Sequence, residues 1–203
     1  MSGPNGGSDE SRHDPPPFTR NAVYIGWFFE GALIGVAFGL GWLLSEPPHI
    51  TMKWDLAALG LGVAATGPML LGLVLLTWIP LLAFRRLTHF FDQFGRPFLA
   101  PYSILDLGVL SLLAGFGEEM LFRAVIQGAV AHRIGTWSAW VVASLLFGLM
   151  HAITPTYVVL ATIAGLYLGG VWLLTENLLV VIIAHALYDS LALIYLLRVK
   201  TVD

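Results

Sequence analysis

The sequence predicts an all-α fold, a polytopic bundle of transmembrane helices. Hydrophobic residues make up 57% of the 203 residues and charged residues only 11%, whereas soluble chains carry roughly a quarter charged residues. The mean hydropathy is +0.79. Six apolar runs approach or exceed the length of about twenty residues that a helix needs to cross roughly 30 Å of hydrocarbon. We therefore expect membrane lipid to solvate most of the chain.

Charge and cysteine content narrow the classes of function. The net charge of -3 and the isoelectric point near 6.0 provide no electrostatic footprint for nucleic acid, so no nucleic-acid partner is expected. The chain has no cysteine, which excludes disulfides, thiolate nucleophiles and cysteine-based zinc sites. Histidine, aspartate and glutamate remain as the side chains that can carry chemistry.

The N-terminal part predicts a tail followed by a first span. Residues 1–20 are rich in Gly, Pro, Ser and charge and have little to bury, so we expect them to be disordered. Residues 21–203 are expected to form a single transmembrane domain. No basic region precedes a short apolar core with a small-residue cleavage site, and the first apolar run, 22–44, is as long as a bilayer requires, which favours a retained span over a signal peptide.

Five further apolar runs follow, at residues 56–84, 103–133, 137–152, 157–174 and 178–197. The first of these is overlong and contains Pro68 and Pro80, which predict a tilt or a kink. The second forms either one span or, if it breaks at the glycines of 115–117, two shorter segments. We therefore predict about six spans, or seven if this run is broken.

The distribution of positive residues favours both termini on the cytoplasmic side, where such residues accumulate. With six spans, the outer side carries only Lys53 and Arg133. The inner side collects Arg12, Arg20, Arg85, Arg86, Arg96, Arg198 and Lys200.

The connector after the second run predicts a short helix in the cytoplasmic interface. An apolar stripe recurs there at i, i+3, i+4 and i+7, formed by Leu87, Phe90, Phe91 and Phe94. A helix packed under the bundle fits the same pattern equally well.

Several ionisable residues fall within the apolar runs. Each costs on the order of 2.5 to 3.5 kcal/mol near the bilayer centre, so a chain that keeps several normally uses them. Their number predicts a polar, hydrated cavity inside the bundle. These residues are Glu30, Asp106, Glu118, Glu119, Arg123, His151, His185 and Asp189.

The segment GEEMLFR places two adjacent carboxylates near one cation. Glu119 and Arg123 are at i and i+4 and share a helical face, whereas Glu118 is rotated by about 100°. We expect Arg123 to neutralise one carboxylate while the other faces the cavity as a base. An ion pair that only fixes helix contacts is an equally good interpretation of this segment alone.

Two histidines complete the candidate set. His151 precedes Pro155, and a lone histidine near a helix end is more often a satisfied polar group than a catalyst. His185 and Asp189 are at i and i+4, so the aspartate can orient the imidazole. A buried hydrogen-bonded pair with a purely structural role is equally plausible.

The three groups together favour hydrolysis by an activated water. A carboxylate base and imidazoles from separate helices can converge on one amide bond. The chain contains neither a serine in a nucleophile-elbow pattern nor the HExxH zinc pattern. A small proton-coupled transporter is the first alternative, since such residues also form relays. A non-catalytic membrane scaffold or immunity protein is the second.

These residues, in this order, resemble the CPBP family of intramembrane proteases, which is named for CAAX-prenyl proteases and bacteriocin-processing proteins and is also called the Abi family. Its first motif matches the glutamate pair, Phe122 and Arg123. Its second matches Phe147 and His151, and its third matches His185 and Asp189. The resemblance covers roughly residues 105–197, and we expect a protease-like core at residues 103–198.

The resemblance implies peptide-bond hydrolysis inside or at the edge of the membrane. Glu118 would activate the water and His151 would help to hold it. His185 and the residue at 189 would stabilise the tetrahedral oxyanion. Membrane-associated peptides or proteins would be the substrates, and the bacterial cytoplasmic (inner) membrane would be the location.

The resemblance leaves the cofactor open. Glu119 and Arg123 would support the site in either case. Two histidines and carboxylates can bind Zn²⁺, with Glu118, His151 and His185 as candidate ligands. We expect metal-independent chemistry, with a divalent metal such as zinc as the alternative.

Two features of the sequence fit the protease resemblance less well. Some relatives carry Asn where this chain has Asp189, and an ionised aspartate cannot donate to an oxyanion, so we expect Asp189 to orient His185 as the donor. The predicted spans also place His151 near the cytoplasmic end of its helix and His185 about 10 Å away along the membrane normal. A cytoplasmic opening of the cavity is the corresponding expectation.

Overall fold

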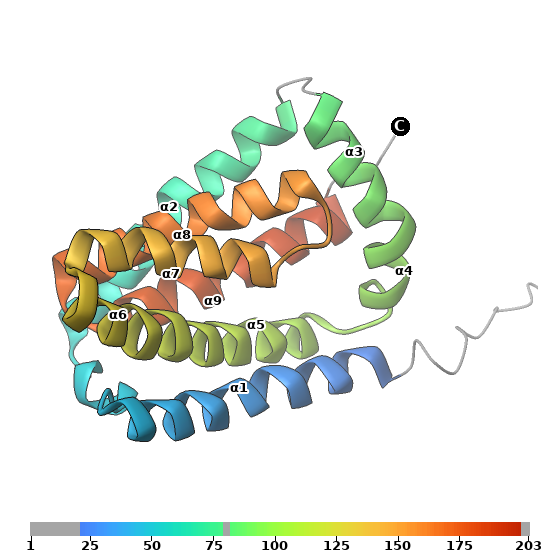
Figure 1. Cartoon of the computed structure of the whole chain (residues 1–203). Coiled ribbons are helices and arrows are strands. Elements are labelled where there is room, and N and C mark those ends of the chain that lie inside the picture. The colour runs from blue at the N-terminus through green and yellow to red at the C-terminus, as the bar shows by residue number, and fades with distance from the viewer. Residues whose placement is uncertain (1–20, 79–81, 200–203) are drawn as a thin grey trace, which may run out of the picture.

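The computed structural model describes residues 21–78 and 82–199, and these residues form a helical bundle without strands (Figure 1). The predicted all-α fold class is therefore confirmed. The expected disordered tail at 1–20 lies outside the described residues, as do Pro80 and Lys200.

The helices follow the predicted apolar runs closely. In chain order they are α1 (Ala22–Leu44), the 3₁₀ turn η2 (Pro48–Thr51), α2 (Leu56–Trp78), α3 (Leu82–Phe90), the π-helix η3 (Phe91–Gly95), α4 (Arg96–Leu99), α5 (Ile104–Glu119), the π-helix η4 (Met120–Gln127), α6 (Gly128–Ile134), α7 (Thr136–Met150), α8 (Pro155–Thr175), α9 (Leu178–Ile194) and the π-helix η5 (Tyr195–Val199).

Four helical segments among the described residues are long and apolar enough to cross a membrane: α1, α2, α8 and the continuous segment Leu178–Val199. A fifth candidate is the pair Leu82–Leu99 and Ile104–Ile134, whose two halves meet at 111°. Helix α7 is apolar but has only 15 residues. The chain is an integral membrane protein, and its described residues contain four candidate spans, or five with the bent pair, rather than the six predicted, because α7 is too short.

Helix α9 is the central helix of the bundle and packs against α2, α5 and α8. Half of the residues in its most apolar stretch are buried, whereas only 11% to 22% are buried in the corresponding stretches of the other three long helices. Figure 1 shows it surrounded by the other helices, with α1 and α5 along one side and α7 and α8 along another. A side chain on α9 can therefore meet residues from several helices.

The run 103–133 is not broken at its glycines, so a seventh span is not formed. Helix α5, η4 and α6 are continuous. The glycines instead allow close packing: a Cβ at Gly115 would lie 2.9 Å from the Ala186 Cβ of α9, and one at Gly117 would lie 2.7 Å from the Glu30 carbonyl of α1. Both glycines bring neighbouring helices against the segment that carries Glu118.

Asp106, one of the ionisable residues within the predicted apolar runs, takes part in a helix cap. The Ser103 side chain accepts from the Asp106 backbone N–H at 3.1 Å, and the Asp106 carboxylate accepts from the Ser103 N–H at 3.0 Å. This reciprocal capping box satisfies two free donors at the start of α5. Asp106 therefore does not belong to a buried polar cavity, contrary to expectation.

The predicted connector helix is present and packs against the bundle. Phe91 and Leu99 contact the cluster formed by Val23, Tyr102, Leu107 and Leu197. Phe94 is largely exposed. Part of the apolar stripe thus faces the bundle, while the proposed position in the membrane interface stays a prediction.

We expect the contact between α2 and α9 to depend on Gly62. A Cβ there would lie 2.6 Å from the Ile183 Cβ, whereas a Cβ at Gly60 would meet nothing within 4 Å. Overpacking costs about 1–3 kcal/mol, so Gly62→Ala should lower the free energy of unfolding in detergent micelles by that amount. Gly60→Ala should leave it unchanged or raise it by up to about 1 kcal/mol. Equal effects would contradict this packing.

Candidate active site

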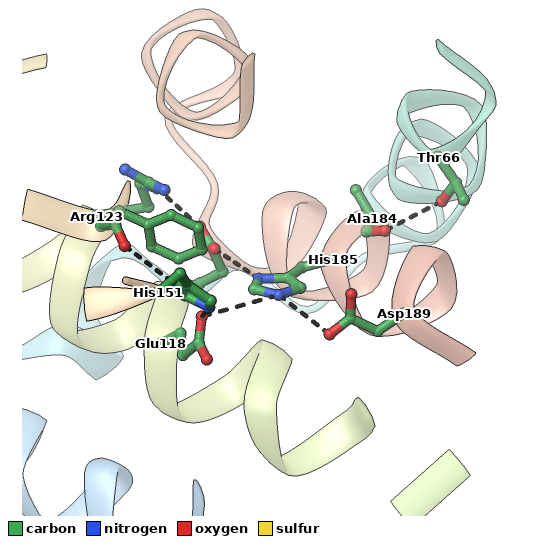
Figure 2. Close-up of polar contacts among 9 residues, drawn as sticks. Thr66, Glu118, Arg123, His151, Ala184, His185 and Asp189 are labelled. Carbon is green, nitrogen blue, oxygen red and sulfur yellow. Dashed lines mark hydrogen bonds and ion pairs between the residues drawn. The ribbon is translucent and has the colours of Figure 1, made fainter. Parts of the chain in front are cut away.

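Three helical segments bring the predicted residues together. Glu118 and Glu119 end α5, and Arg123 lies in η4. His151 follows the last residue of α7, and α9 carries His185 and Asp189. Figure 2 shows Glu118, His151 and His185 pointing toward one another, with Asp189 beyond His185.

The expected ion pair between Glu119 and Arg123 is present and fully buried. The Arg123 Nε lies 2.9 Å from the Glu119 Oε2, and both side chains are 0% exposed. The guanidinium also lies over the Phe147 ring, 5.1 Å from its centroid, in a cation–π contact. The pair therefore compensates two charges that lipid would not solvate.

Glu119, rather than Asp189, holds the Nδ1 side of His185. The Glu119 Oε1 lies 2.8 Å from the His185 Nδ1. The Asp189 Oδ2 lies 3.4 Å from the opposite nitrogen, Nε2. The orienting role expected of Asp189 therefore falls to Glu119, because the i, i+4 spacing of His185 and Asp189 places the carboxylate on the reactive edge of the ring.

His151 is oriented by its own helix. Its Nδ1 lies 2.8 Å from the Phe147 carbonyl oxygen. Since a carbonyl only accepts, Nδ1 carries the hydrogen in the neutral ring, and Nε2 is left as an acceptor. That Nε2 faces the Glu118 carboxylate.

Glu118 lies at the centre of the cluster. Its Oε2 is buried without a hydrogen-bond partner, while 11% of the side chain remains exposed. The Nε2 atoms of His151 and His185 lie 3.7 Å and 3.9 Å from this oxygen. These separations exceed a direct hydrogen bond but allow one water oxygen to reach all three atoms.

The predicted offset of about 10 Å between the two histidines is absent. Both Nε2 atoms lie within 3.9 Å of the same Glu118 oxygen. The reason is the 15-residue length of α7, which is about 22 Å at 1.5 Å per residue. Its C-terminal end therefore meets the middle of the long helix that carries Glu118, rather than that helix's end.

The alternative chemistry for this site is a divalent metal held by Glu118, His151 and His185. Among residues 21–78 and 82–199, no group of three or more His, Asp or Glu side chains is arranged to hold a metal ion. Glu118, His151 and His185 thus do not fit a metal centre as placed. The expected metal-independent chemistry stays a prediction.

The expected hydrated cavity around these residues also stays a prediction. A hollow of about 370 Å³ lies elsewhere, between the C-terminal end of α1 and α6, and its polar lining includes Glu46, His132 and Arg133.

Two further residues approach the cluster without having been assigned a role. Glu30 of α1 interacts electrostatically with His185 and Asp189, and its Oε2 is buried without a partner. The Tyr157 ring of α8 packs edge-on against His151, with ring centroids 5.7 Å apart. The ionisable side chain of Glu30 within an apolar run could have identified it as a site residue, whereas nothing in the sequence singled out Tyr157.

The fold and the site define an integral membrane protein with a buried glutamate–histidine cluster, and comparison with known proteins agrees. Residues 100–191 match the family described as type II CAAX prenyl endopeptidase Rce1-like. This match spans 92 of the 203 residues, agrees with the resemblance to the CPBP family and includes all six predicted site residues. The uncharacterized protein YpbD of Bacillus subtilis (strain 168) is 29% identical over 169 residues, 78% of this chain and 81% of that protein. No solved structure matches significantly.

We expect loss of Arg123 to destabilise the fold itself. Arg123→Ala leaves the Glu119 charge buried and unpaired, which costs about 3–5 kcal/mol. Arg133→Ala is the matched control, because Arg133 is exposed on the same continuous helix and donates only to the Ala129 carbonyl; it should change stability by about 0.5 kcal/mol or less. Unfolding in micelles measures both, and equal effects would refute a structural role for the buried pair.

Proposed function

We propose that this protein is an intramembrane endopeptidase in which Glu118 activates a water molecule for attack on a peptide bond. The observation that carries the proposal is the convergence of the two histidine Nε2 atoms on the unpartnered Glu118 Oε2, at 3.7 Å and 3.9 Å. The match of residues 100–191 to a protease family supports it.

The chemistry needs one base that also returns a proton. Glu118 takes a proton from the water while the water oxygen bonds to the peptide carbonyl carbon, and the carbonyl oxygen becomes an oxyanion. His151 holds the same water through its accepting Nε2. Collapse of the intermediate then breaks the C–N bond, and Glu118 passes its proton to the leaving amine. One water is consumed, and a carboxylic acid and an amine are released.

Two carboxylates divide the work because their partners differ. Glu119 uses both oxygens, one for Arg123 and one for His185, and is therefore a positioning residue. Glu118 has no such partner and remains available as the base. His185 would stabilise the oxyanion through Nε2, which requires a proton on that nitrogen because Nδ1 already donates to Glu119.

The substrates are membrane-associated peptides or proteins, and lipid is the surrounding partner. A leader of a secreted peptide, a C-terminal anchor of a sorted protein and a prenyl-like tail all meet this description. The bacterial cytoplasmic membrane, with both termini inside, is the proposed location. The positive residues Arg85, Arg86 and Arg96, between the second and third apolar runs, support a cytoplasmic position for that connector.

The decisive experiment compares membrane and secreted peptides from cells that produce the wild-type protein, Glu118→Ala, Glu118→Gln or no protein. Truncated peptides should appear with the wild type and fall at least about 100-fold with either variant, because both remove the general base. The peptides would also name the substrate. Cleavage that persists in Glu118→Ala, or flux of a solute without any cleavage, would overturn the proposal.

The roles of His185 and Asp189 can be separated by substitution. Asp189→Asn should retain substantial proteolysis, since Glu119 still orients the imidazole, whereas His185→Ala should lower kcat by about 100-fold or more because an oxyanion donor is lost. Cleavage rates of the purified variants on the identified peptide provide the measurement. Comparable losses in both variants would count against this division of roles.

A further inference from the structure

The site has many hydrogen-bond acceptors and few donors. The neutral His151 ring presents an accepting Nε2, since its Nδ1 hydrogen is bound to the Phe147 carbonyl. The Nδ1 hydrogen of His185 is bound to Glu119. Asp189 and Glu118 are acceptors when ionised, and Asp189 lies 3.4 Å from the one nitrogen of His185 that faces the site. An oxyanion formed there in a low-dielectric surrounding needs a donor that does not depend on an added proton.

Tyr157 carries such a donor next to the histidines. It lies in the first turn of α8, where its backbone N–H donates to the Thr154 side chain at 3.1 Å. Pro155 occupies the first helical position and further restrains this turn. Only five residues separate Tyr157 from His151, and the two rings meet edge-on at 74°. The tyrosine ring is therefore held at a fixed place beside the cluster.

The Tyr157 ring lies against His151, and its hydroxyl is within electrostatic reach of the two carboxylates of the cluster that have no arginine partner. It interacts electrostatically with Asp189 and Glu118, and with the neighbouring Tyr188 phenol. Within the described residues it forms no hydrogen bond, unlike the Tyr167 hydroxyl on the same helix, which donates to the Ala65 carbonyl at 2.8 Å. The donor of Tyr157 is thus available to a group that enters the site.

We propose that Tyr157 is a further catalytic residue, whose hydroxyl donates a hydrogen bond to the oxyanion of the tetrahedral intermediate beside His185. The phenol supplies a neutral donor where Asp189 supplies only an acceptor. This inference rests on the proposed proteolysis.

The test measures kcat and KM of the full-length protein, purified in detergent, on the peptide identified from cells. Tyr157→Phe should lower kcat by about 100-fold, as expected for the loss of one oxyanion donor, with little change in KM. Tyr167→Phe is the matched control, because it removes a phenol from the same helix that has a structural partner; its kcat should stay at the wild-type value. Tyr188→Phe should also keep its kcat.

A second variant separates hydrogen bonding from packing. A fluorinated tyrosine at position 157 keeps the ring and strengthens the hydroxyl as a donor, so kcat should respond to it while thermal stability stays unchanged. A purely structural tyrosine would leave kcat unmoved, and that result would overturn the inference.

The remaining outcomes are equally decisive. A wild-type kcat in Tyr157→Phe, a rise in KM alone, or a loss confined to Tyr188→Phe would each overturn the inference while the proposed function stands. A wild-type protein that cleaves no peptide would overturn both together.

Discussion

The buried chain from Arg123 through Glu119 to His185 is the interaction on which the rest of the site depends. Both side chains of the ion pair are fully buried, and a charge left unpaired in such a place is costly. Glu119 meets that constraint with one oxygen on each partner, at 2.9 Å and 2.8 Å. It thereby ties the long helix α5–η4–α6 to the central helix α9. The same contacts turn the free edge of the imidazole toward Glu118.

Helix packing makes this chain possible. The close approach at Gly115 places α5 against α9, and the approach at Gly117 places it against α1. Phe147 links the remaining helix, since its ring contacts His151 and lies under the Arg123 guanidinium. The short α7 then ends beside Glu118. Small residues at the contacts and one aromatic ring between them thus set the distances among groups from three helices.

The site shows how two neighbouring carboxylates acquire different chemistry. Glu119 has both of its oxygens occupied, whereas the Glu118 Oε2 has no partner and faces two imidazoles. A carboxylate whose oxygens both have partners positions other groups, whereas a carboxylate with a free oxygen can exchange a proton. The same contrast applies to the phenols of α8: Tyr167 is bound to a backbone carbonyl, and Tyr157 is not. Hydrogen-bond occupancy, more than residue type, distinguishes the structural groups here from those that we propose to react.

Composition and helical periodicity were sufficient to predict the lipid-solvated helical bundle and the Glu119–Arg123 pair, because both depend on local properties of the chain. The Ser103–Asp106 capping box was equally local, although Asp106 was assigned to a cavity. Periodicity could not show that Glu119 bonds His185, 66 residues away, or that α7 ends level with Glu118. Those facts were decided by the tertiary structure, since spacing along a helix determines which side chains share a face, whereas packing between helices determines what that face meets.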